Sequence, residues 1–173
     1  MEVILVDEQD NAIGSMGKME VHEKAILHRA FSIFIFNKKG EILLQKRAAN
    51  KYHSAGLWTN TCCSHPRPGE DTLTAAHNRL QEEMGFTTEL SKTFSFIYKA
   101  PFDNGLTEHE YDHVFTGTYN GIVQPNPQEV SDYCYQSVEA IKSNIIMQPG
   151  NFTEWFKIAL PKLEQYIAKQ QKG

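Results

Sequence analysis

The chain has 173 residues, of which 40% are hydrophobic and 22% are charged, and its formal net charge is -4. These values are typical of one globular domain, and the negative charge argues against a general affinity for nucleic acid or anionic membranes. Three cysteines are too few for a disulfide framework, no apolar leader follows Met1, and no apolar run approaches the ~20 residues that span a bilayer. We therefore expect a soluble protein of the reducing cytoplasm.

In chain order, hydrophobic periodicity and turn residues predict a mixture of strands and helices. The predicted strands are 2–7, 29–36, 41–46, 58–63, 93–99, 108–119 and 130–136, and the predicted helices are 71–84, 137–143 and 153–169. Residues 37–40 join two strands as a hairpin, and Pro161 should bend the last helix because proline removes a helical hydrogen bond. The pattern predicts a mixed sheet with helices against it, in one α+β or α/β domain over residues 1–173.

Two pairs of chemically active side chains lie two residues apart in predicted strands. Successive strand residues point to opposite faces, so Glu108 and Glu110 share one face, and Cys63 and His65 share another. Each pair can therefore serve one pocket. His109, between the two carboxylates, should face away from them.

His22 and His28 add two imidazoles to these pairs. Their spacing matches neither a strand pair nor one helical turn, so a bend in the chain must bring them together. Three imidazoles, two carboxylates and a thiol suit both a metal site and proton-transfer chemistry.

The predicted helix over 71–84 has a buried face and an acidic edge. Leu73, Ala76, Leu80 and Met84 recur at helical spacing and predict the buried stripe, while Gly85 supplies the C-terminal stop. A carboxylate at position 83 borders this stripe, so it needs a partner.

Gly69-Glu70 followed by Arg79, Glu82, Glu83 and Gly85 resembles the Nudix signature, a glycine-rich loop before a helix whose paired carboxylates hold a divalent cation against a diphosphate. The match is partial, because Asn78-Arg79 replaces the Arg-Glu pair of the family's hydrolases and Ser64 stands at the first glycine. Fewer carboxylates weaken the case for multi-metal hydrolysis. In a purely structural interpretation Arg79 forms an ion pair with Glu83. Glu82 is then a solvated surface charge or a residue that contacts the metal ligands and not the metal itself.

Three segments resemble the type 1 isopentenyl diphosphate isomerase family, and the similarity covers nearly the whole chain. They are the segment from His22 to Phe31, which ends in Leu27-His28-Arg29-Ala30-Phe31, the stretch from Trp58 to Pro66, and Thr107 to Glu110. The resemblance implies a Nudix-like α/β/α sandwich. It also implies the interconversion of isopentenyl diphosphate and dimethylallyl diphosphate for isoprenoid biosynthesis, by adding a proton at one end of an allylic system and removing one from the other.

Carried over by position, the resemblance assigns four groups of residues. Cys63 and Glu110 are the proton-transfer pair on opposite faces of the substrate, with Tyr98 and Trp155 as active-site aromatics. A protein-bound divalent metal, Mn2+, Zn2+ or Mg2+, would be held by His22, His28, His65, Glu108 and Glu110. Glu83 and the Cys63 backbone would bind Mg2+ that arrives with the diphosphate. The substrate-binding set is Lys18, Arg47, Lys51, Ser64 and Arg79.

The chemistry makes its own physical demands on such a site. Protonating an unactivated double bond creates a tertiary carbocation, which requires an acid in a dry cavity and a surface that tolerates positive charge, such as an aromatic face. By residue type alone, however, Tyr98 and Trp155 are core aromatics, and Lys18, Arg47 and Lys51 are solvated surface charges.

Two other functions fit parts of the same pattern. One is a Nudix hydrolase of a nucleoside diphosphate derivative, and the other is a non-catalytic domain that binds a diphosphate. Hydrolysis assisted by a metal needs no thiol, so Cys63 separates the isomerase from the hydrolase. The expected partner is the small diphosphate substrate, with neither nucleic acid nor membrane, and a monomer is the default with a dimer as the alternative. Several residues remain without a site role: His53, His77, His113, Trp58, Cys62 and Cys134.

Overall fold

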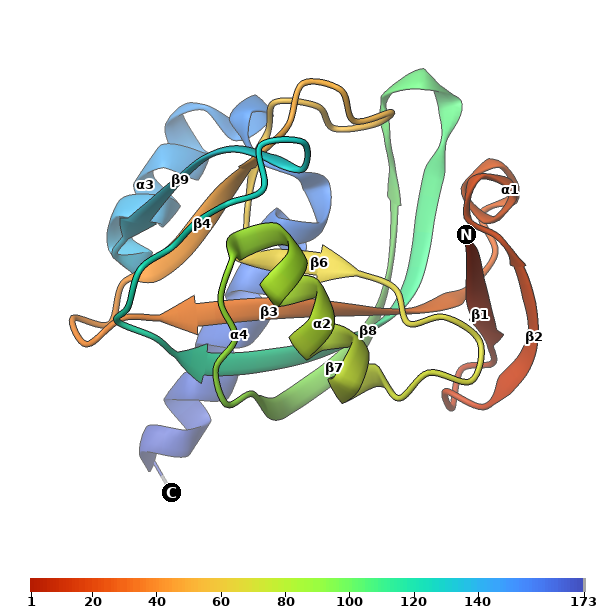
Figure 1. Ribbon diagram of the computed structural model, residues 1–173, viewed down its shortest axis with the longest axis horizontal. Helices are drawn as coiled ribbons and strands as arrows, with labels where there is room; N and C mark the ends of the chain where they lie inside the picture. The colour runs from red at the N-terminus through yellow and green to blue at the C-terminus, as the bar shows by residue number, and fades with distance from the viewer. Residues whose placement is uncertain (173) are drawn as a thin grey trace.

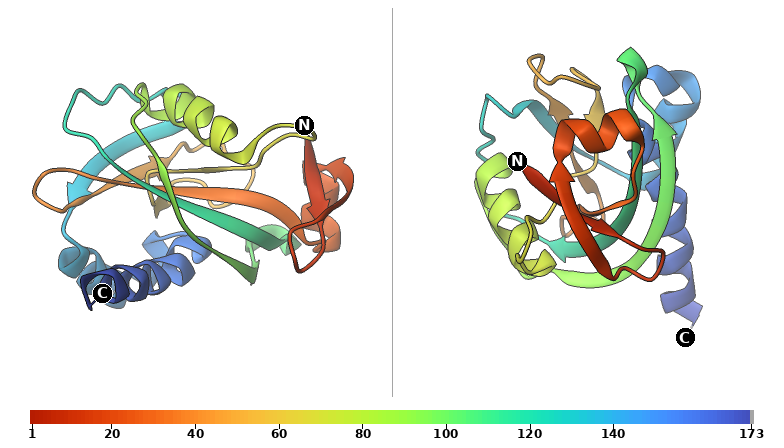
Figure 2. Two further views of the ribbon diagram at one scale, coloured as in Figure 1. Left: turned by 90° about the horizontal axis from the view of Figure 1, so that it is seen from below. Right: turned by 90° about the vertical axis from the view of Figure 1, so that its right-hand side faces the viewer.

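The computed structural model describes residues 1–172. Among these residues, a nine-stranded mixed sheet has helices on both of its faces (Figures 1 and 2). The strands are β1 (Glu2–Val6), β2 (Ala12–Gly17), β3 (His28–Phe36), β4 (Ile42–Arg47), β5 (Trp58–Thr59), β6 (Cys62–Ser64), β7 (Ser91–Pro101), β8 (Thr107–Thr118) and β9 (Val130–Gln136). The helices are α1 (Lys18–Lys24), α2 (Thr72–Met84), α3 (Val138–Met147) and α4 (Glu154–Lys172), with short 3-10 turns η1 (Asp103–Gly105) and η2 (Pro149–Asn151). The predicted α+β sandwich is confirmed.

The continuous apolar run of β3 follows from burial of both faces of the strand. Ile33 and Ile35 pack in a cluster with Leu80 of α2. Phe34 points the other way, into a cluster with Phe156 of α4. Because neighbouring strand residues face opposite layers, a strand between two helical layers needs apolar residues at nearly every position. Figure 2 shows α2 on one side of the sheet and the helices of the C-terminal third on the other.

Strand register sets the rows of side chains that form the site. β3 runs parallel to β8, and β8 runs antiparallel to β7. Tyr98 of β7, Glu110 of β8 and His28 of β3 are successive partners across these three strands. On its other edge β3 pairs with β6, where Ser32 lies opposite Cys63. Pairing among four strands, β3, β6, β7 and β8, therefore brings these residues to one region of the sheet.

The predicted strands are correct in outline, but the pairing differs in three places. The hairpin of 29–36 and 41–46 pairs only at Phe36 and Ile42, because β4 turns away to pair with β9 and β5. The single strand predicted over 58–63 is two short strands, separated where Asn60 and Thr61 turn their side chains to buried backbone carbonyls. The sequence predicts no helix or strand between residues 8 and 28, where the structure has β2 and α1.

Helix α2 begins and ends as its sequence predicts. The Asp71 side chain accepts a hydrogen bond from the Thr74 backbone N–H, and Gly85 adopts the left-handed conformation that ends the helix. The predicted buried stripe is wrong at Leu73, which is 39% exposed, while Ala75 is buried. Spacing gives the direction of a side chain but not how far the neighbouring layer extends.

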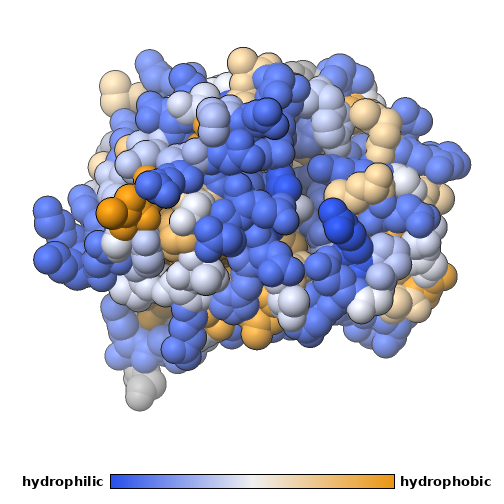
Figure 3. Space-filling view, in the orientation of Figure 1, coloured by the Kyte–Doolittle hydropathy of each residue, from blue (hydrophilic) through white to orange (hydrophobic). Residues whose placement is uncertain are grey.

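Helix α4 continues through Pro161 and covers the face of the sheet opposite α2 (Figures 1 and 2). None of the helices within residues 1–172 combines the length and apolarity required to cross a bilayer. The face of the molecule that carries α2 is mostly hydrophilic, with scattered apolar residues (Figure 3).

Candidate active site

A cavity of about 320 Å³ opens between the sheet, α2 and the loop over residues 48–57. This volume lies within the range of small-molecule pockets, which begins at about 300 Å³. All the predicted site residues except His22 and His28 line this cavity, and those two lie against its wall beside His65. Cys63 and Glu110, the predicted proton-transfer pair, thus share one cavity.

Four buried side chains converge in a cluster that suits a divalent cation. His22, His28, His65 and Glu110 each offer a ligand atom within 4.8 Å of the others. The Glu110 Oε2 lies 2.7 Å from His65 Nε2 and 3.3 Å from His28 Nε2. Buried nitrogens of all three imidazoles, His22 Nε2, His28 Nε2 and His65 Nδ1, have no hydrogen-bond partner. Buried polar atoms without partners are rare, so a cation fits this donor set.

A local turn brings His22 and His28 together. Helix α1 ends at Ala25, whose φ of 55° reverses the chain into β3 within three residues. His28 then lies opposite Glu110 through the parallel pairing of β3 with β8. The bend that the sequence requires is therefore the left-handed end of a short helix.

Hydrogen bonds on the far nitrogens orient two of these imidazoles. His28 Nδ1 lies 2.8 Å from the Ile26 carbonyl, and His22 Nδ1 lies 2.8 Å from the Tyr52 hydroxyl. With the proton on Nδ1, each Nε2 presents its lone pair to the cluster. Burial, followed by the charge of neighbouring groups, lowers the pKa of His22 to about 3. Burial also lowers the pKa of His65, to about 4, so both are in the neutral form that binds metals.

Glu108 lies outside the four converging ligands. Its Oε2 is 3.8 Å from His22 Nε2, and the Tyr98 hydroxyl contacts both Glu108 and Glu110. Burial and then the Glu110 charge raise the pKa of Glu108 well above its ordinary value. Burial would also raise the pKa of Glu110, but the histidines beside it hold that pKa well below normal. The single hydroxyl proton of Tyr98 cannot be donated to both carboxylates at once. The pair of Glu108 and Glu110 therefore requires a further proton or a cation.

The Cys63 thiol belongs to a buried polar network that the sequence analysis missed. Its Sγ donates to Asn60 Oδ1 at 3.0 Å and contacts Ser32 Oγ at 3.5 Å, and the Ser32 hydroxyl donates to Asp112 at 2.7 Å. The Asn60 amide nitrogen donates to two backbone carbonyls, which fixes the amide with its oxygen toward the thiol. Burial, and then the nearby Asp112 charge, raise the pKa of Cys63, so the group carries its proton. A serine within the apolar run of β3 was the available signal.

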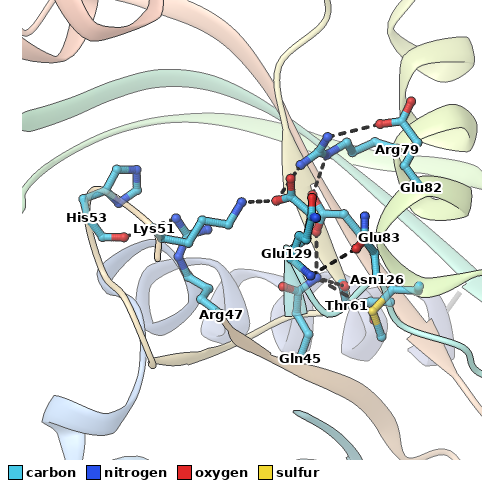
Figure 4. Close-up of polar contacts among 12 residues, drawn as sticks. Gln45, Arg47, Lys51, His53, Thr61, Arg79, Glu82, Glu83, Asn126 and Glu129 are labelled. Carbon is cyan, nitrogen blue, oxygen red and sulfur yellow. Dashed lines mark hydrogen bonds and ion pairs between the residues drawn. The ribbon is translucent and has the colours of Figure 1, made fainter. Parts of the chain in front are cut away.

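Cationic and acidic side chains face each other at the other end of the cavity (Figure 4). Arg79 contacts Glu83 through Nε, Glu82 at 3.1 Å and Glu129 at 3.0 Å. The second Glu83 oxygen accepts from Gln45 Nε2 at 2.9 Å. The pairing of Arg79 with Glu83 is thus present, and Glu82 is exposed, as the structural interpretation predicts.

Four cations from separate segments line this cavity, although the whole chain is acidic. Lys51 pairs with Glu129, a residue that the sequence did not single out. Arg47 donates to the His53 carbonyl at 3.2 Å, and its guanidinium lies 5.2 Å from the Trp155 ring centre. Lys18 and Arg79 complete the set. Such a cluster can bind an anion with two or more phosphate oxygens.

Aromatic side chains line the same cavity, and one of them, Trp155, lies beside the Arg47 guanidinium. Trp155 is 4% exposed and Tyr98 is 6% exposed, so both are core residues and cavity walls at once. His53 also lines the cavity, although the sequence left it without a role. His109 lies on the other side of β8 and contacts the Ala25 carbonyl, in agreement with strand alternation.

Comparisons with known proteins agree with this geometry. The NUDIX domain family matches residues 26–156. An isopentenyl-diphosphate Delta-isomerase of Pectobacterium atrosepticum is 51% identical over 165 residues, which cover 95% of this chain and 92% of that protein. Isopentenyl-diphosphate Delta-isomerase 2 of Photorhabdus laumondii is 56% identical over 155 residues, which cover 90% of this chain and 88% of that protein.

Solved structures show the same fold at low sequence identity. DR0079 from Deinococcus radiodurans has a TM-score of 0.77 and 17% identity, with 94% of this chain and 98% of that chain covered. A MutT protein from Methanosarcina mazei has a TM-score of 0.66 and 20% identity, with 83% and 95% covered. Fold, cavity and relatives together show that the chain belongs to the isopentenyl-diphosphate Delta-isomerase family of Nudix proteins.

Proposed function

We propose that this chain interconverts isopentenyl diphosphate and dimethylallyl diphosphate. The observation that carries the proposal is its 51% and 56% identity, over nine tenths of its length or more, to two proteins named for this activity. The cavity supports it, because a thiol, a carboxylate and aromatic walls lie together with a cationic end.

The reaction moves one double bond and changes no other bond order. A proton adds to the terminal methylene carbon, which leaves positive charge on the branched carbon beside it. A proton then leaves the methylene group on the diphosphate side of that carbon, and the new double bond forms there. One proton enters and one leaves, so the site needs two proton-transfer groups and no redox cofactor for atom balance.

In our proposal Cys63 and Glu110 are these two groups and lie on opposite faces of the substrate. The Cys63 thiol is held by Asn60, and Glu110 contacts the Tyr98 hydroxyl at 2.6 Å. Trp155 presents an aromatic face to the developing cation, an interaction that gains about 2 kcal/mol or more when the cation is desolvated. The aromatic walls keep water from the charge.

Two cation sites complete the proposal. His22, His28 and His65 with Glu110 would hold a divalent metal, with Glu108 as a further ligand, and these residues fix the position of the Glu110 carboxyl group. A bound divalent cation supplies positive charge that orients a carboxylate and polarises the groups around it.

The diphosphate would bind at the cationic end of the cavity. Glu83 and the Cys63 backbone would hold the Mg2+ that accompanies the substrate, and four cations with the Ser64 side chain would bind the phosphate oxygens. The cations are Lys18, Arg47, Lys51 and Arg79.

Labelling in deuterated water tests the reaction. The protein is incubated with isopentenyl diphosphate, Mg2+ and Mn2+, and the products are followed by NMR. The proposal requires dimethylallyl diphosphate with deuterium in its methyl group. Release of inorganic phosphate or diphosphate without isomerisation would instead indicate a hydrolase, and an unlabelled, unchanged substrate would indicate a binding domain.

The thiol gives a sharper test. Cys63→Ala should abolish isomerisation, because it removes one of the two proton-transfer groups. Cys134→Ala is the matched control, since Cys134 is a free cysteine outside the cavity. Normal turnover by Cys63→Ala would refute the assigned role.

We also propose that the enzyme is a cytoplasmic monomer. The three cysteines in the structure are free, which suits a reducing compartment. Size-exclusion chromatography with light scattering measures the oligomeric state, and a dimer mass would refute the monomer.

A further inference from the structure

The loop over residues 48–57 contributes four consecutive residues to the cavity lining, from Asn50 to His53. Lys51 pairs with Glu129 at the cationic end, and the Tyr52 hydroxyl contacts the Nδ1 atom of His22. The next residue, His53, is 5% exposed and lines the cavity beside Trp155. In Figure 4, His53 lies apart from Arg79, with Lys51 between them.

His53 packs against two aromatic side chains that also contact each other. Its ring stacks on Phe102 with centroids 4.1 Å apart and planes 8° apart. The edge contact with Trp155 has a centroid distance of 5.8 Å and an angle of 83°. Phe102 in turn meets the Trp155 ring at 5.9 Å. His53 and Trp155 line the cavity and Phe102 does not, so the three rings pack against one another with two of them at the cavity wall.

The same contact joins two loops. Phe102 lies in the turn between β7 and β8, and Asn104 in that turn donates its side-chain N–H to the Tyr52 carbonyl at 3.0 Å. Arg47 donates to the His53 carbonyl at 3.2 Å. The backbone around His53 is therefore held from both sides, which keeps the imidazole over Phe102.

Trp155 depends on this packing for its orientation. Its indole Nε1 is buried and has no hydrogen-bond partner within the described residues. An indole with no polar anchor is oriented by the side chains around it. Those include His53, Phe102 and the Arg47 guanidinium, which lies 5.2 Å from the ring centre. Removing His53 would leave a gap beside the indole and a path for water.

We propose that His53 is a positioning residue that holds the Trp155 indole and seals the hydrocarbon end of the cavity against water. The inference rests on the proposed isomerisation, whose cationic intermediate water would capture. In that capture a water oxygen bonds to the branched carbon, and one of its protons leaves to solvent. The product is 3-hydroxy-3-methylbutyl diphosphate, a tertiary alcohol that the sealed enzyme does not release.

His53 touches the metal cluster without belonging to it, since its ring meets His22 edge-on with centroids 5.7 Å apart. It is not among the four side chains whose ligand atoms converge, and its Nδ1 lies 3.2 Å from the hydroxyl of Ser54. Its stacking on Phe102 requires a flat ring but neither ring nitrogen. A phenylalanine should therefore replace His53, whereas a small side chain should not.

The first experiment measures products. His53→Ala should lower kcat by about tenfold or more with little change in KM, since small misplacements of reacting groups cost that much. It should also release the tertiary alcohol, detected by NMR with labelled substrate. His53→Phe should restore kcat and suppress the alcohol, and His77→Ala, outside the cavity on α2, should match the wild type. Wild-type kcat without alcohol in His53→Ala would overturn the inference, as would failure of His53→Phe to restore kcat.

The second experiment needs no turnover and separates this inference from the proposed function. In a Trp58→Phe background Trp155 is the one remaining tryptophan, and acrylamide quenching reports its access to solvent. Quenching should increase in His53→Ala and return to the reference in His53→Phe. Unchanged quenching in His53→Ala would overturn the inference even in an active enzyme, whereas an inactive wild type would refute only the function. If His53→Ala does not fold, Phe102→Ala removes the same stack and must give the same increase.

Discussion

Asn60 offers a prediction whose size can be worked from the structure. Its side chain is 1% exposed and makes four hydrogen bonds. The amide nitrogen donates to the carbonyls of Ile33 and Cys62, and the amide oxygen accepts from the Thr59 hydroxyl and the Cys63 thiol. With about 0.5–1.5 kcal/mol net for each bond, Asn60→Ala should lower the free energy of unfolding by about 2–6 kcal/mol.

Urea unfolding measures this change, with Asn120→Ala as the control. Asn120 is exposed and accepts one hydrogen bond, from the Lys38 backbone N–H. Asn120→Ala should therefore lower the free energy of unfolding by no more than about 1 kcal/mol. A loss below about 1 kcal/mol for Asn60→Ala, with an unchanged m-value, would refute the bond-by-bond reasoning.

The same variant also tests the orientation of the thiol. Under conditions where Asn60→Ala remains folded, kcat should still fall, because the Cys63 S–H has lost the acceptor that orients it. Activity that falls only in proportion to the folded fraction would show that Asn60 serves stability alone.

Two further predictions concern the metal and acid stability. Chelation should lower the thermal midpoint of the wild type, and added Mn2+ or Zn2+ should restore it. At a metal concentration one hundred times the dissociation constant, binding should add about 2.7 kcal/mol to the free energy of unfolding. A similar response in His28→Ala would contradict the ligand set. Burial raises the pKa of Glu129, but its ion pairs with Lys51 and Arg79 outweigh this and leave the pKa lowered. The Glu129 carboxylate therefore stabilises the fold at pH values above its pKa in the unfolded state, and this contribution is lost as the pH falls through its pKa in the folded state. In Glu129→Gln, the urea midpoint should therefore decrease less than in the wild type between about pH 6 and pH 3. An equal decrease of the urea midpoint in the wild type and in Glu129→Gln would count against that pairing.

Local rules were sufficient for several parts of the fold. Helix α2 has its cap at Asp71 and its stop at Gly85, because both depend on interactions within a few residues. The shared face of Glu108 and Glu110 follows from the alternation of one strand, and both side chains line the cavity. These features needed no knowledge of the rest of the chain.

Other residues could not be found in this way. Tyr52, His53 and Glu129 lie in loops, and their contacts with His22, Trp155 and Arg79 join segments far apart in sequence. Composition and spacing say nothing about such pairs. Ser32 was the exception, since a hydroxyl in the buried run of β3 already required a partner.

By itself, then, the chain's amino-acid order determined which side chains share a face and which residues resemble an isomerase family. Only the tertiary structure decided that Tyr98, Glu110 and His28 form one row across three strands, and that the left-handed turn at Ala25 returns the chain so that His22 joins them. The physical reason is the separation along the sequence of the residues that interact. Alternation and capping are set by neighbours along the backbone, whereas register and loop placement are set by packing of the whole sheet against its two helical layers.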